Sequence, residues 1–164
     1  MSIVVREAQP SDLPVAFPLW EALHREHEAR DPRYRLADDA ASRWTTDFRD
    51  WTRSRSSRVW LAVDRGEAVG LLTAHLYEPA PLYRQSLIVH VTDLYVSPDA
   101  RGSGLGSDML REARAWGEAE GALALQAGVL ALNDRGRAFW TAQGADDYSI
   151  TVSLPIRPGA PSSS

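Results

Sequence analysis

The chain has 164 residues, of which 44% are hydrophobic and 24% are charged, and this composition is typical of one globular domain with a real core. Its formal net charge is −4 and its pI is about 5.5. This acidity argues against nucleic acid as the main partner, because phosphate binding needs a basic surface, and it permits a cationic partner such as an amine.

Two residue types are missing from the chain. There is no cysteine, and all 18 basic side chains are arginine. Disulfides, thiolate metal sites, cysteine nucleophiles, Schiff-base lysines and phosphate-loop lysines are therefore excluded. We expect no metal site.

The N-terminal residues 1–7 contain no basic segment followed by an apolar run, and no apolar run in the chain approaches the ~18 residues that cross a bilayer. We therefore expect no signal peptide, no membrane partner and a cytoplasmic location.

The first half of the chain predicts a strand, two helices and a hairpin. Residues 3–6 form a short apolar run, and a first helix begins at a cap on Ser11 or Asp12. We expect this helix to reach residue 28 with a kink or break at Pro18, and residues 26–39 to form a loop. A second helix is predicted over 38–54, with Trp44, Phe48 and Trp51 on its core face. Strands 59–63 and 68–77 flank a turn at 64–67.

The second half alternates strands and helices. The predicted ranges are strand 87–96, helix 105–119, strand 123–129, helix 133–143 and strand 148–154. This order predicts an α/β fold with a mixed sheet, and no repeat or linker divides it, so we expect one domain over residues 1–154. The Pro- and Ser-rich residues 155–164 predict a disordered tail.

The segment from 91 to 106 carries most of the chemical information. It reads as a strand, a proline-containing turn and three glycines, Gly102, Gly104 and Gly106, that open a helix. Glycines let backbone N–H groups approach a ligand closely, and a helix N-terminus favours negative charge. Arg101 adds a permanent positive charge. The pattern indicates a pyrophosphate-binding loop, with a structural glycine turn as the alternative.

Two familiar phosphate motifs do not fit this loop. The Rossmann pattern places glycines as G-x-G-x-x-G in the first βα turn, whereas these glycines alternate and lie two-thirds along the chain. A P-loop needs a lysine, which the chain lacks.

The loop resembles the signature Arg/Gln-x-x-Gly-x-Gly/Ala of GNAT acetyltransferases, through Arg101, Gly104 and Gly106. A second block resembles the family's later motif, Asn-x-x-Ala-x-x-Leu/Phe-Tyr-x-x-x-Gly-Phe. The matching residues are Asn133, Gly136, Phe139, Trp140 and Gly144. The element order over residues 3–154 also resembles the family. The resemblance implies the GNAT acyl-CoA N-acyltransferase fold, with splayed middle strands flanked by helices. The loop is most similar to the diamine acetyltransferase subgroup.

The resemblance also implies a role for each matched position. Backbone groups of Leu94, Tyr95 and Val96 would hold the acetyl carbonyl and the pantetheine of acetyl-CoA. Asn133 would contact the pantetheine arm, flanked by Phe139 and Trp140. The pyrophosphate would lie on the loop formed by Arg101, Gly102, Ser103, Gly104, Leu105 and Gly106, with Ser107 nearby.

Trp140 departs from the family pattern. Many members have a tyrosine there to protonate the leaving thiolate, and an indole N–H cannot serve as that acid. The acid is left open between Tyr95, Tyr148, water and no dedicated group.

A base must remove the proton of the acceptor amine. Strand alternation predicts that His90 and Thr92 share one face of residues 87–96 and that Asp93 shares the other. His90, Asp93 and Glu78 are the candidate catalytic residues, with His75 as a further possibility. Asp93 resembles an acceptor-site aspartate of polyamine acetyltransferases. For each of them a purely structural role is the alternative.

The sequence thus predicts an acetyl-CoA-dependent N-acetyltransferase that acts on a primary amine, by direct attack in a ternary complex, and that forms a homodimer in keeping with family habit. A small-molecule acceptor is the main prediction. The alternatives are a protein or N-terminal acetyltransferase, a non-catalytic acyl-CoA-binding module, and a nucleotide-phosphate enzyme that uses the glycine loop.

Overall fold

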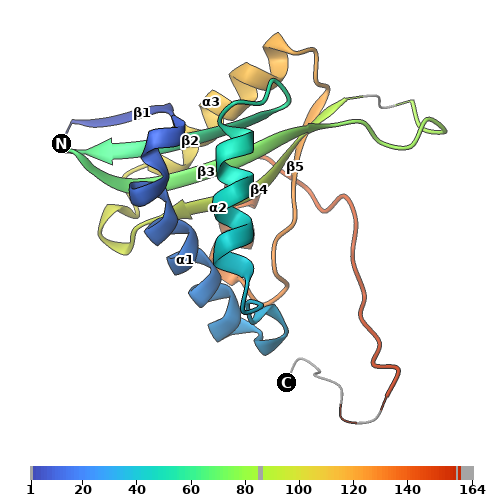
Figure 1. Cartoon of the computed structure of the whole chain (residues 1–164). Coiled ribbons are helices and arrows are strands. Elements are labelled where there is room, and N and C mark those ends of the chain that lie inside the picture. Colours follow the sequence, from blue (N-terminus) through green and yellow to red (C-terminus); the bar gives the residue numbers. More distant parts are fainter. Residues whose placement is uncertain (1, 85–86, 158, 160–164) are drawn as a thin grey trace. The chain divides into compact units, whose positions relative to one another are not determined.

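The structure is a computed structural model of the chain, and it describes residues 2–84, 87–157 and 159. Figure 1 labels its regular elements, whose bounds follow. The strands are β1 (Ile3–Glu7), β2 (Ser57–Asp64), β3 (Glu67–Tyr77), β4 (Ile88–Val96) and β5 (Ala124–Ala127). The α-helices are α1 (Leu13–Arg30), α2 (Ala40–Trp51), α3 (Leu105–Ala119) and α4 (Asp134–Ala142).

The chain divides into two compact units. The first contains residues 1–23 and 38–128, and the second contains residues 24–37 and 129–164. The boundary crosses α1, so that helix contributes to both units. One domain over residues 1–154 stays a prediction.

The first unit is built on a mixed sheet in the order β1-β2-β3-β4-β5. Its pairs are antiparallel except for β4 and β5, which run parallel. The parallel pairing extends only from Ile88–Ala124 to Val91–Ala127, while β4 continues to Val96. The predicted mixed sheet and the separation of its middle strands are confirmed.

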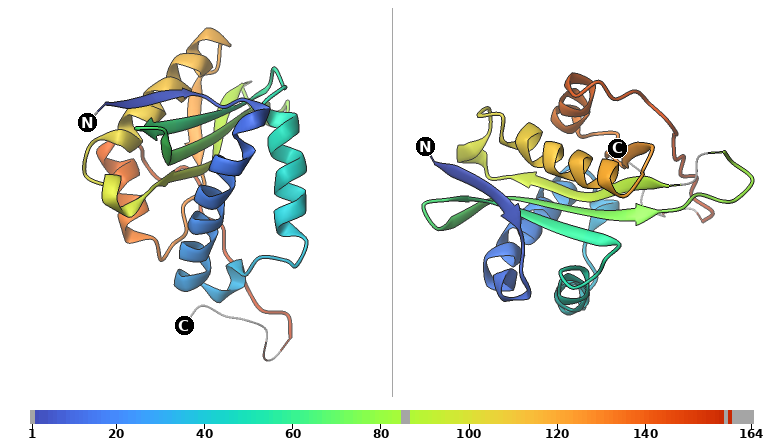
Figure 2. Two further views of the ribbon diagram at one scale, coloured as in Figure 1. Left: turned by 60° about the vertical axis from the view of Figure 1, so that its left-hand side comes forward. Right: turned by 90° about the horizontal axis from the view of Figure 1, so that it is seen from above.

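Helices cover both faces of this sheet, as the edge-on view in Figure 2 shows. On one face, Leu61 and Leu71 of the sheet share a core with Phe48 of α2 and Trp20 of α1. Trp20 stacks on Trp44 with ring centroids 5.1 Å apart, so the predicted core face of α2 is confirmed at Trp44 and Phe48.

On the other face, α3 packs closely against the sheet. Trp116 meets Trp60 edge-on at 5.8 Å, and Met109 lies where Gly70 has no side chain. Gly117 faces Val89 in the same way. Glycines on both surfaces therefore let α3 approach the strands closely.

The second unit, taken by itself, contains both polar and aromatic contacts. Arg135 of α4 pairs with Glu26 at 3.1 Å, and buried Asp31 accepts hydrogen bonds from the guanidinium of Arg33. His27 and Tyr34 meet edge-on at 6.3 Å.

None of the helices in the described part of the chain is long and apolar enough to span a membrane.

Several boundaries differ from the prediction. The helix over 105–119 and the hairpin are confirmed, but α1 continues to Arg30, so the predicted loop at 26–39 is wrong at its start. The i,i+4 ion pair between Glu26 and Arg30 supports that extra turn. Pro18 does not split α1. Proline has no N–H, so the helix loses one hydrogen bond, the one that residue 18 would donate to the Pro14 carbonyl. Because Pro14 lies in the first turn, the loss affects only the start of the helix.

The predicted strand over 148–154 is wrong. The described residues of this segment have no regular secondary structure, and Figure 1 draws the segment as a tube rather than an arrow. A strand requires a hydrogen-bonded neighbour, and this segment pairs with no described strand. The predicted disordered tail falls at 158 and 160–164 on residues outside the described ones.

Candidate active site

The glycine loop forms a cradle of backbone donors at the start of α3. Gly104 is the residue before the helix and has φ +83°, and Gly102 has φ +81°, both in the left-handed region that favours glycine. Within the described residues, the N–H groups of Gly102, Ser103 and Gly104 donate no hydrogen bond to the protein. The first N–H groups of a helix also lack intrahelical acceptors. The loop therefore presents several backbone donors together.

The space beside these glycines is open. A Cβ built on Gly102 or Gly104 would meet no protein atom within 4 Å. The cradle can therefore admit an anionic group close to its backbone, and the positive end of the α3 dipole favours that charge. The Leu105 side chain is buried, so at this position only the backbone faces a ligand.

Arg101 braces the loop against β4. Its Nε donates to the Val96 carbonyl at 2.8 Å, and its guanidinium lies 5.5 Å from the centroid of the Tyr95 ring. Ser103 Oγ donates to the Ala100 carbonyl at 2.7 Å. Both side chains hold the loop in shape, so the unpaired donors of the cradle come from the backbone.

A β-bulge changes which side chains of β4 share a face. Pairing shifts between Thr73 and Ala74, so that Thr73 lies opposite Asp93 whereas His75 lies opposite His90. Because Thr73 and His75 are two residues apart on β3, His90 and Asp93 are brought to one face of the sheet. The simple alternation that separated His90 from Asp93 is therefore wrong.

The bulge creates a polar seam, which we define as Ser57, Thr73, His75, His90 and Asp93 together with Thr92. The seam lies on the sheet face covered by α1 and α2, because Leu71, two residues before Thr73 on β3, belongs to that core. The sequence pattern showed His75, His90 and Asp93 but missed Ser57 and Thr73, since neither residue type marks a site without its neighbours.

His75 lies at the centre of a hydrogen-bonded chain. Its Nδ1 lies 2.8 Å from Ser57 Oγ and its Nε2 lies 3.3 Å from Thr92 Oγ1. Thr92 Oγ1 in turn donates to the Thr73 carbonyl at 3.4 Å. Burial lowers the pKa of His75, and the nearby His90 lowers it further. Neutral His75 with its proton on Nε2 satisfies every contact in this chain.

Asp93 is the most perturbed acid of the seam. Its side chain is buried, and burial raises its pKa from 3.8 to about 6, although hydroxyls of Thr73 and Thr92 stabilise the carboxylate and oppose this rise. Thr73 Oγ1 makes no well-aligned hydrogen bond within the described residues, yet it lies close enough to Asp93 to act on its pKa. A carboxyl with this pKa is ionised at neutral pH and accepts protons more readily than an ordinary aspartate.

The other predicted residues lie elsewhere. Glu78 follows the end of β3, is exposed, and makes no hydrogen bond or ion pair with any described residue of the seam. Asn133, Phe139 and Trp140 belong to the second unit, where Asn133 Oδ1 caps α4 by accepting from the Gly136 N–H at 3.0 Å. Phe139 and Trp140 meet edge-on at 5.5 Å.

The two residues considered as the acid also differ in setting. Tyr95 is buried beneath Arg101, and Tyr148 is exposed in the second unit. No cluster of three or more potential metal ligands occurs among the residues that the structure describes.

A strand that contains a bulge and leads into a glycine cradle can be compared with known proteins. Residues 19–145 match the acetyltransferase (GNAT) family. The chain belongs to this family. No curated protein matches it.

Solved structures agree with the GNAT fold. A mutant of the BH1408 protein from Bacillus halodurans has a TM-score of 0.83 at 25% identity, covering 94% of this chain and 99% of that one. The aminoglycoside acetyltransferase AAC(6')-Iy, in complex with a bisubstrate analogue, CoA-S-monomethyl-acetylneamine, has a TM-score of 0.77 at 17% identity, covering 96% and 99%. AAC(6')-IG from Acinetobacter haemolyticus has a TM-score of 0.74 at 16% identity, covering 94% and 98%.

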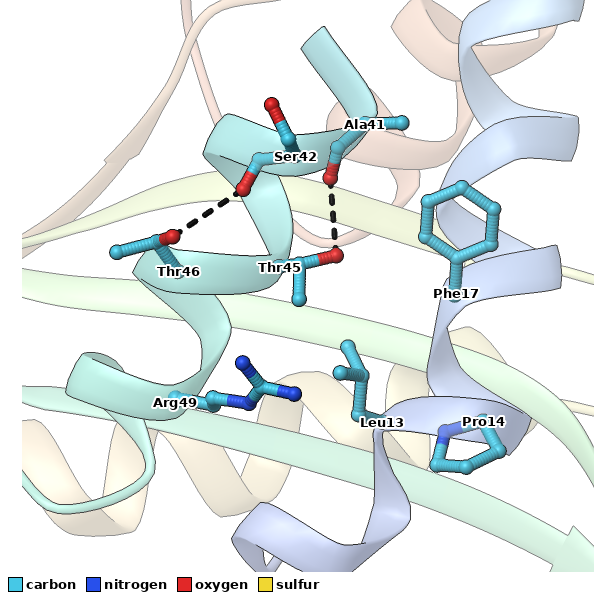
Figure 3. A pocket seen from close by; sticks show the side chains of 8 residues that line it. All are labelled: Leu13, Pro14, Phe17, Ala41, Ser42, Thr45, Thr46 and Arg49. Carbon is cyan, nitrogen blue, oxygen red and sulfur yellow. Dashed lines mark hydrogen bonds between the residues drawn. The ribbon is translucent and has the colours of Figure 1, made fainter. Parts of the chain in front are cut away.

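This GNAT chain also has a hollow of about 630 Å³ between α1 and α2, shown in Figure 3. Its lining consists of Leu13, Pro14, Phe17, Ala41, Ser42, Thr45, Thr46 and Arg49. The hydroxyls of Thr45 and Thr46 donate back to carbonyls of their own helix, at 2.9 and 3.2 Å. None of the predicted site residues lines this hollow, so we assign it no part in the chemistry.

Proposed function

We propose that the protein transfers an acetyl group from acetyl-CoA to the primary amine of a small molecule, by direct attack in a ternary complex. The observation that carries the proposal is the cradle of unpaired N–H groups at the start of α3, in a chain of the GNAT family. An anionic pyrophosphate matches such donors in charge and geometry.

The residues present fit acetyl-CoA. The glycines leave open space for the pyrophosphate, and β4 runs beyond its pairing with β5, which supports placing the acetyl and pantetheine groups along Leu94, Tyr95 and Val96. When bound, acetyl-CoA supplies an activated thioester. The chain's role is to orient that thioester, polarise its carbonyl with backbone N–H groups, and accept the proton that the amine loses.

We assign the proton-accepting role to Asp93, with His90 as the second candidate. Asp93 lies on the same sheet face as His90, and its raised pKa suits a base at neutral pH. Because Asp93 is buried, the proton of the amine must reach it over a short relay. Thr92 is suitably placed for this relay, because it is the extra residue of the bulge in β4, is exposed, and has its hydroxyl close to Asp93. Glu78 was the third candidate, and its exposed position beyond β3 gives it less support.

The acceptor class rests on two kinds of support. The loop resembles that of diamine acetyltransferases, and structural relatives are named as aminoglycoside acetyltransferases. Both groups act on amines of small molecules. A protein or N-terminal acetyltransferase and a non-catalytic acyl-CoA-binding module are the competing functions, and the tryptophan at 140 motivates the second of these.

The first experiment is calorimetric titration with acetyl-CoA, followed by an amine panel in which release of free CoA thiol is monitored. Micromolar binding with thiol release on a diamine or aminoglycoside is the expected result. Release only with peptides would favour the protein acetyltransferase, and binding without any release would favour the non-catalytic module. Absence of binding would refute the proposal.

A pair of matched variants tests the cradle itself. Gly104→Ala and Gly66→Ala each place a Cβ at a residue with φ above +80° and open surroundings, so both bring similar backbone strain. Only Gly104 belongs to the cradle, whereas Gly66 lies in the turn between β2 and β3. Gly104→Ala should weaken acetyl-CoA binding at least about tenfold, equivalent to about 1.4 kcal/mol. Gly66→Ala should leave the affinity unchanged, and equal losses would contradict the assigned role.

A further inference from the structure

The hydroxyl of Thr92 has to be oriented before it can pass a proton to Asp93. A hydroxyl has one proton and two lone pairs, so it relays a proton only when its own proton points at the final acceptor and a lone pair points at the donor. Thr92 is exposed and is the extra residue of the bulge, so strand pairing does not fix its side chain. Another group must therefore hold this hydroxyl in place.

Two acceptors lie within reach of the Thr92 proton. One is the Thr73 carbonyl, 3.4 Å from Thr92 Oγ1, which is longer than a typical hydroxyl hydrogen bond. The other is the carboxylate of Asp93, which the Thr92 hydroxyl stabilises. A hydrogen bond to an ionised carboxylate is the stronger of the two kinds, so the Thr92 proton turns to Asp93 when Asp93 is ionised. With either acceptor, the proton points away from His75.

His75 must then donate to Thr92. Its Nε2 lies 3.3 Å from Thr92 Oγ1, and because Thr92 uses its single proton elsewhere, Nε2 has to carry the proton of this hydrogen bond. Nδ1 of the neutral ring is an acceptor, and the Ser57 hydroxyl, 2.8 Å away, donates to it. The hydrogen bonds therefore run in one direction, from Ser57 through His75 to Thr92.

Neighbours on two other elements hold the His75 ring in this orientation. Ser57 of β2 lies directly opposite His75 in the strand pairing, and its side chain is buried. Trp51 of α2 meets the ring edge-on, with centroids 4.9 Å apart. Burial lowers the pKa of His75, and His90 of β4 lowers it further, whereas Asp47 of α2 raises it. The ring is therefore neutral at neutral pH, and only one of its nitrogens carries a proton.

We propose, resting on the function proposed above, that His75 is a positioning residue for acetyl transfer, whose Nε2–H holds the Thr92 hydroxyl with its proton toward Asp93 and a free lone pair toward the acceptor amine. The amine gives its proton to Thr92 Oγ1 as the Thr92 proton passes to the Asp93 carboxylate, and the electron pair of the broken N–H bond stays on nitrogen. The hydroxyl is thereby restored, and His75 itself neither gains nor loses a proton.

The first test needs no substrate, so its outcome does not depend on whether the protein transfers acetyl groups. Nitrogen-15 NMR distinguishes protonated from unprotonated ring nitrogens, and loss of one signal in His75→Gln identifies His75 among the four histidines. At neutral pH, wild-type His75 should have a protonated Nε2 and an unprotonated Nδ1. A proton on Nδ1 in the wild-type protein would overturn the proposal.

The second test is a matched pair of variants at His75. Glutamine keeps an N–H donor near the position of Nε2 but cannot titrate, whereas leucine fills a similar space without a donor. With the acceptor found in the amine panel, His75→Leu should lower kcat by roughly 10- to 100-fold with little change in KM, because the hydroxyl loses its orientation. The apparent pKa of its rate profile should rise, since Thr92 no longer stabilises ionised Asp93 as well. His75→Gln should keep most of the wild-type rate and pH profile.

The outcomes of this pair separate positioning from other roles of His75. Equal losses in His75→Gln and His75→Leu would mean that the ring carries a proton, and full activity of His75→Leu would mean that it has no role, so either result overturns the proposal. A wild-type protein without transfer activity would contradict the proposed function instead. Carbon-13 NMR titration of the Asp93 carboxyl then provides the readout, with a raised pKa expected in His75→Leu and not in His75→Gln.

Discussion

At the scale of single residues, the burial of Asp93 has a measurable consequence for stability. Its raised pKa means that the folded chain binds this proton more tightly than the unfolded chain, so stability falls as pH rises from about 4 to about 6. The rise of this pKa from 3.8 to about 6 corresponds to a loss of about 3 kcal/mol in the free energy of unfolding. The loss is complete once the pH is well above 6. Asp93→Asn cannot ionise, so its stability relative to wild type should increase across this window. Urea unfolding from pH 3.5 to 8 measures it.

The matched control for this prediction is Asp99→Asn, which changes an exposed carboxyl in the turn after β4. Its stability relative to wild type should show no comparable trend over the same pH range. If the difference in unfolding free energy between Asp93→Asn and wild type did not change with pH, the Asp93 carboxyl would be solvated or paired in solution.

The same substitution tests the proton-accepting role. If Asp93 is the base, the wild-type rate of acetyl transfer should rise through an apparent pKa of about 6 and then level off. Asp93→Asn should lower kcat by about 10²-fold or more and remove this rise, in line with typical contributions of general bases. Because the variant is expected to be more stable at neutral pH, unfolding cannot explain the loss. His90→Gln is the comparison, and a larger effect there would transfer the role to His90.

The residues of the seam illustrate what the sequence could and could not predict about the site. The cradle was predictable, because glycines before a helix act through local backbone geometry. The seam was not, since His90 and Asp93 share a face only because of a bulge between β3 and β4. A bulge depends on how two strands pair, and no local pattern in either strand marks this one.

At the scale of elements, the packing of α3 on β4 predicts a sensitive glycine. A Cβ on Gly117 would lie 2.5 Å from Val89 Cγ2, and Val89 is buried and branched, so it cannot turn away easily. Gly117→Ala should therefore destabilise the protein by about 1–3 kcal/mol, as overpacked cores do, despite the better helix propensity of alanine. Thermal unfolding measures the loss.

A double mutant separates this clash from other effects of Gly117→Ala. Val89→Ala removes the methyl group that the new Cβ would meet and by itself leaves a small cavity. In the double mutant the two losses should partly cancel, with a coupling energy of at least about 0.5 kcal/mol. Simple additivity would show that the clash is relieved by movement of α3 instead.

The elements also show where prediction from sequence was strong. The range of α3 was predicted to the residue because its amphipathic pattern begins at a glycine and ends near another, both local signals. The strand at 148–154 was wrong for the described chain although its alternation is clear, because a strand depends on a partner that local pattern cannot supply. The early end assigned to α1 failed for a related reason, since polar residues 26–30 are held in the helix by ion pairs.

At the scale of the whole molecule, binding of acetyl-CoA should be visible as global stabilisation. A ligand that binds only the folded state at 100 times its Kd adds about 2.7 kcal/mol to the unfolding free energy. For a chain of this length that corresponds to a rise in Tm of roughly 5 to 10 °C.

Desulfo-CoA keeps the pyrophosphate but cannot carry an acetyl group, so it should give most of the rise in Tm if the cradle provides most of the affinity. Adenosine, which lacks the pyrophosphate, should give little. The Gly104→Ala protein should need about tenfold more acetyl-CoA for the same shift. A rise that is equal for adenosine and acetyl-CoA would mean that the nucleoside, and not the backbone cradle of α3, provides the binding energy.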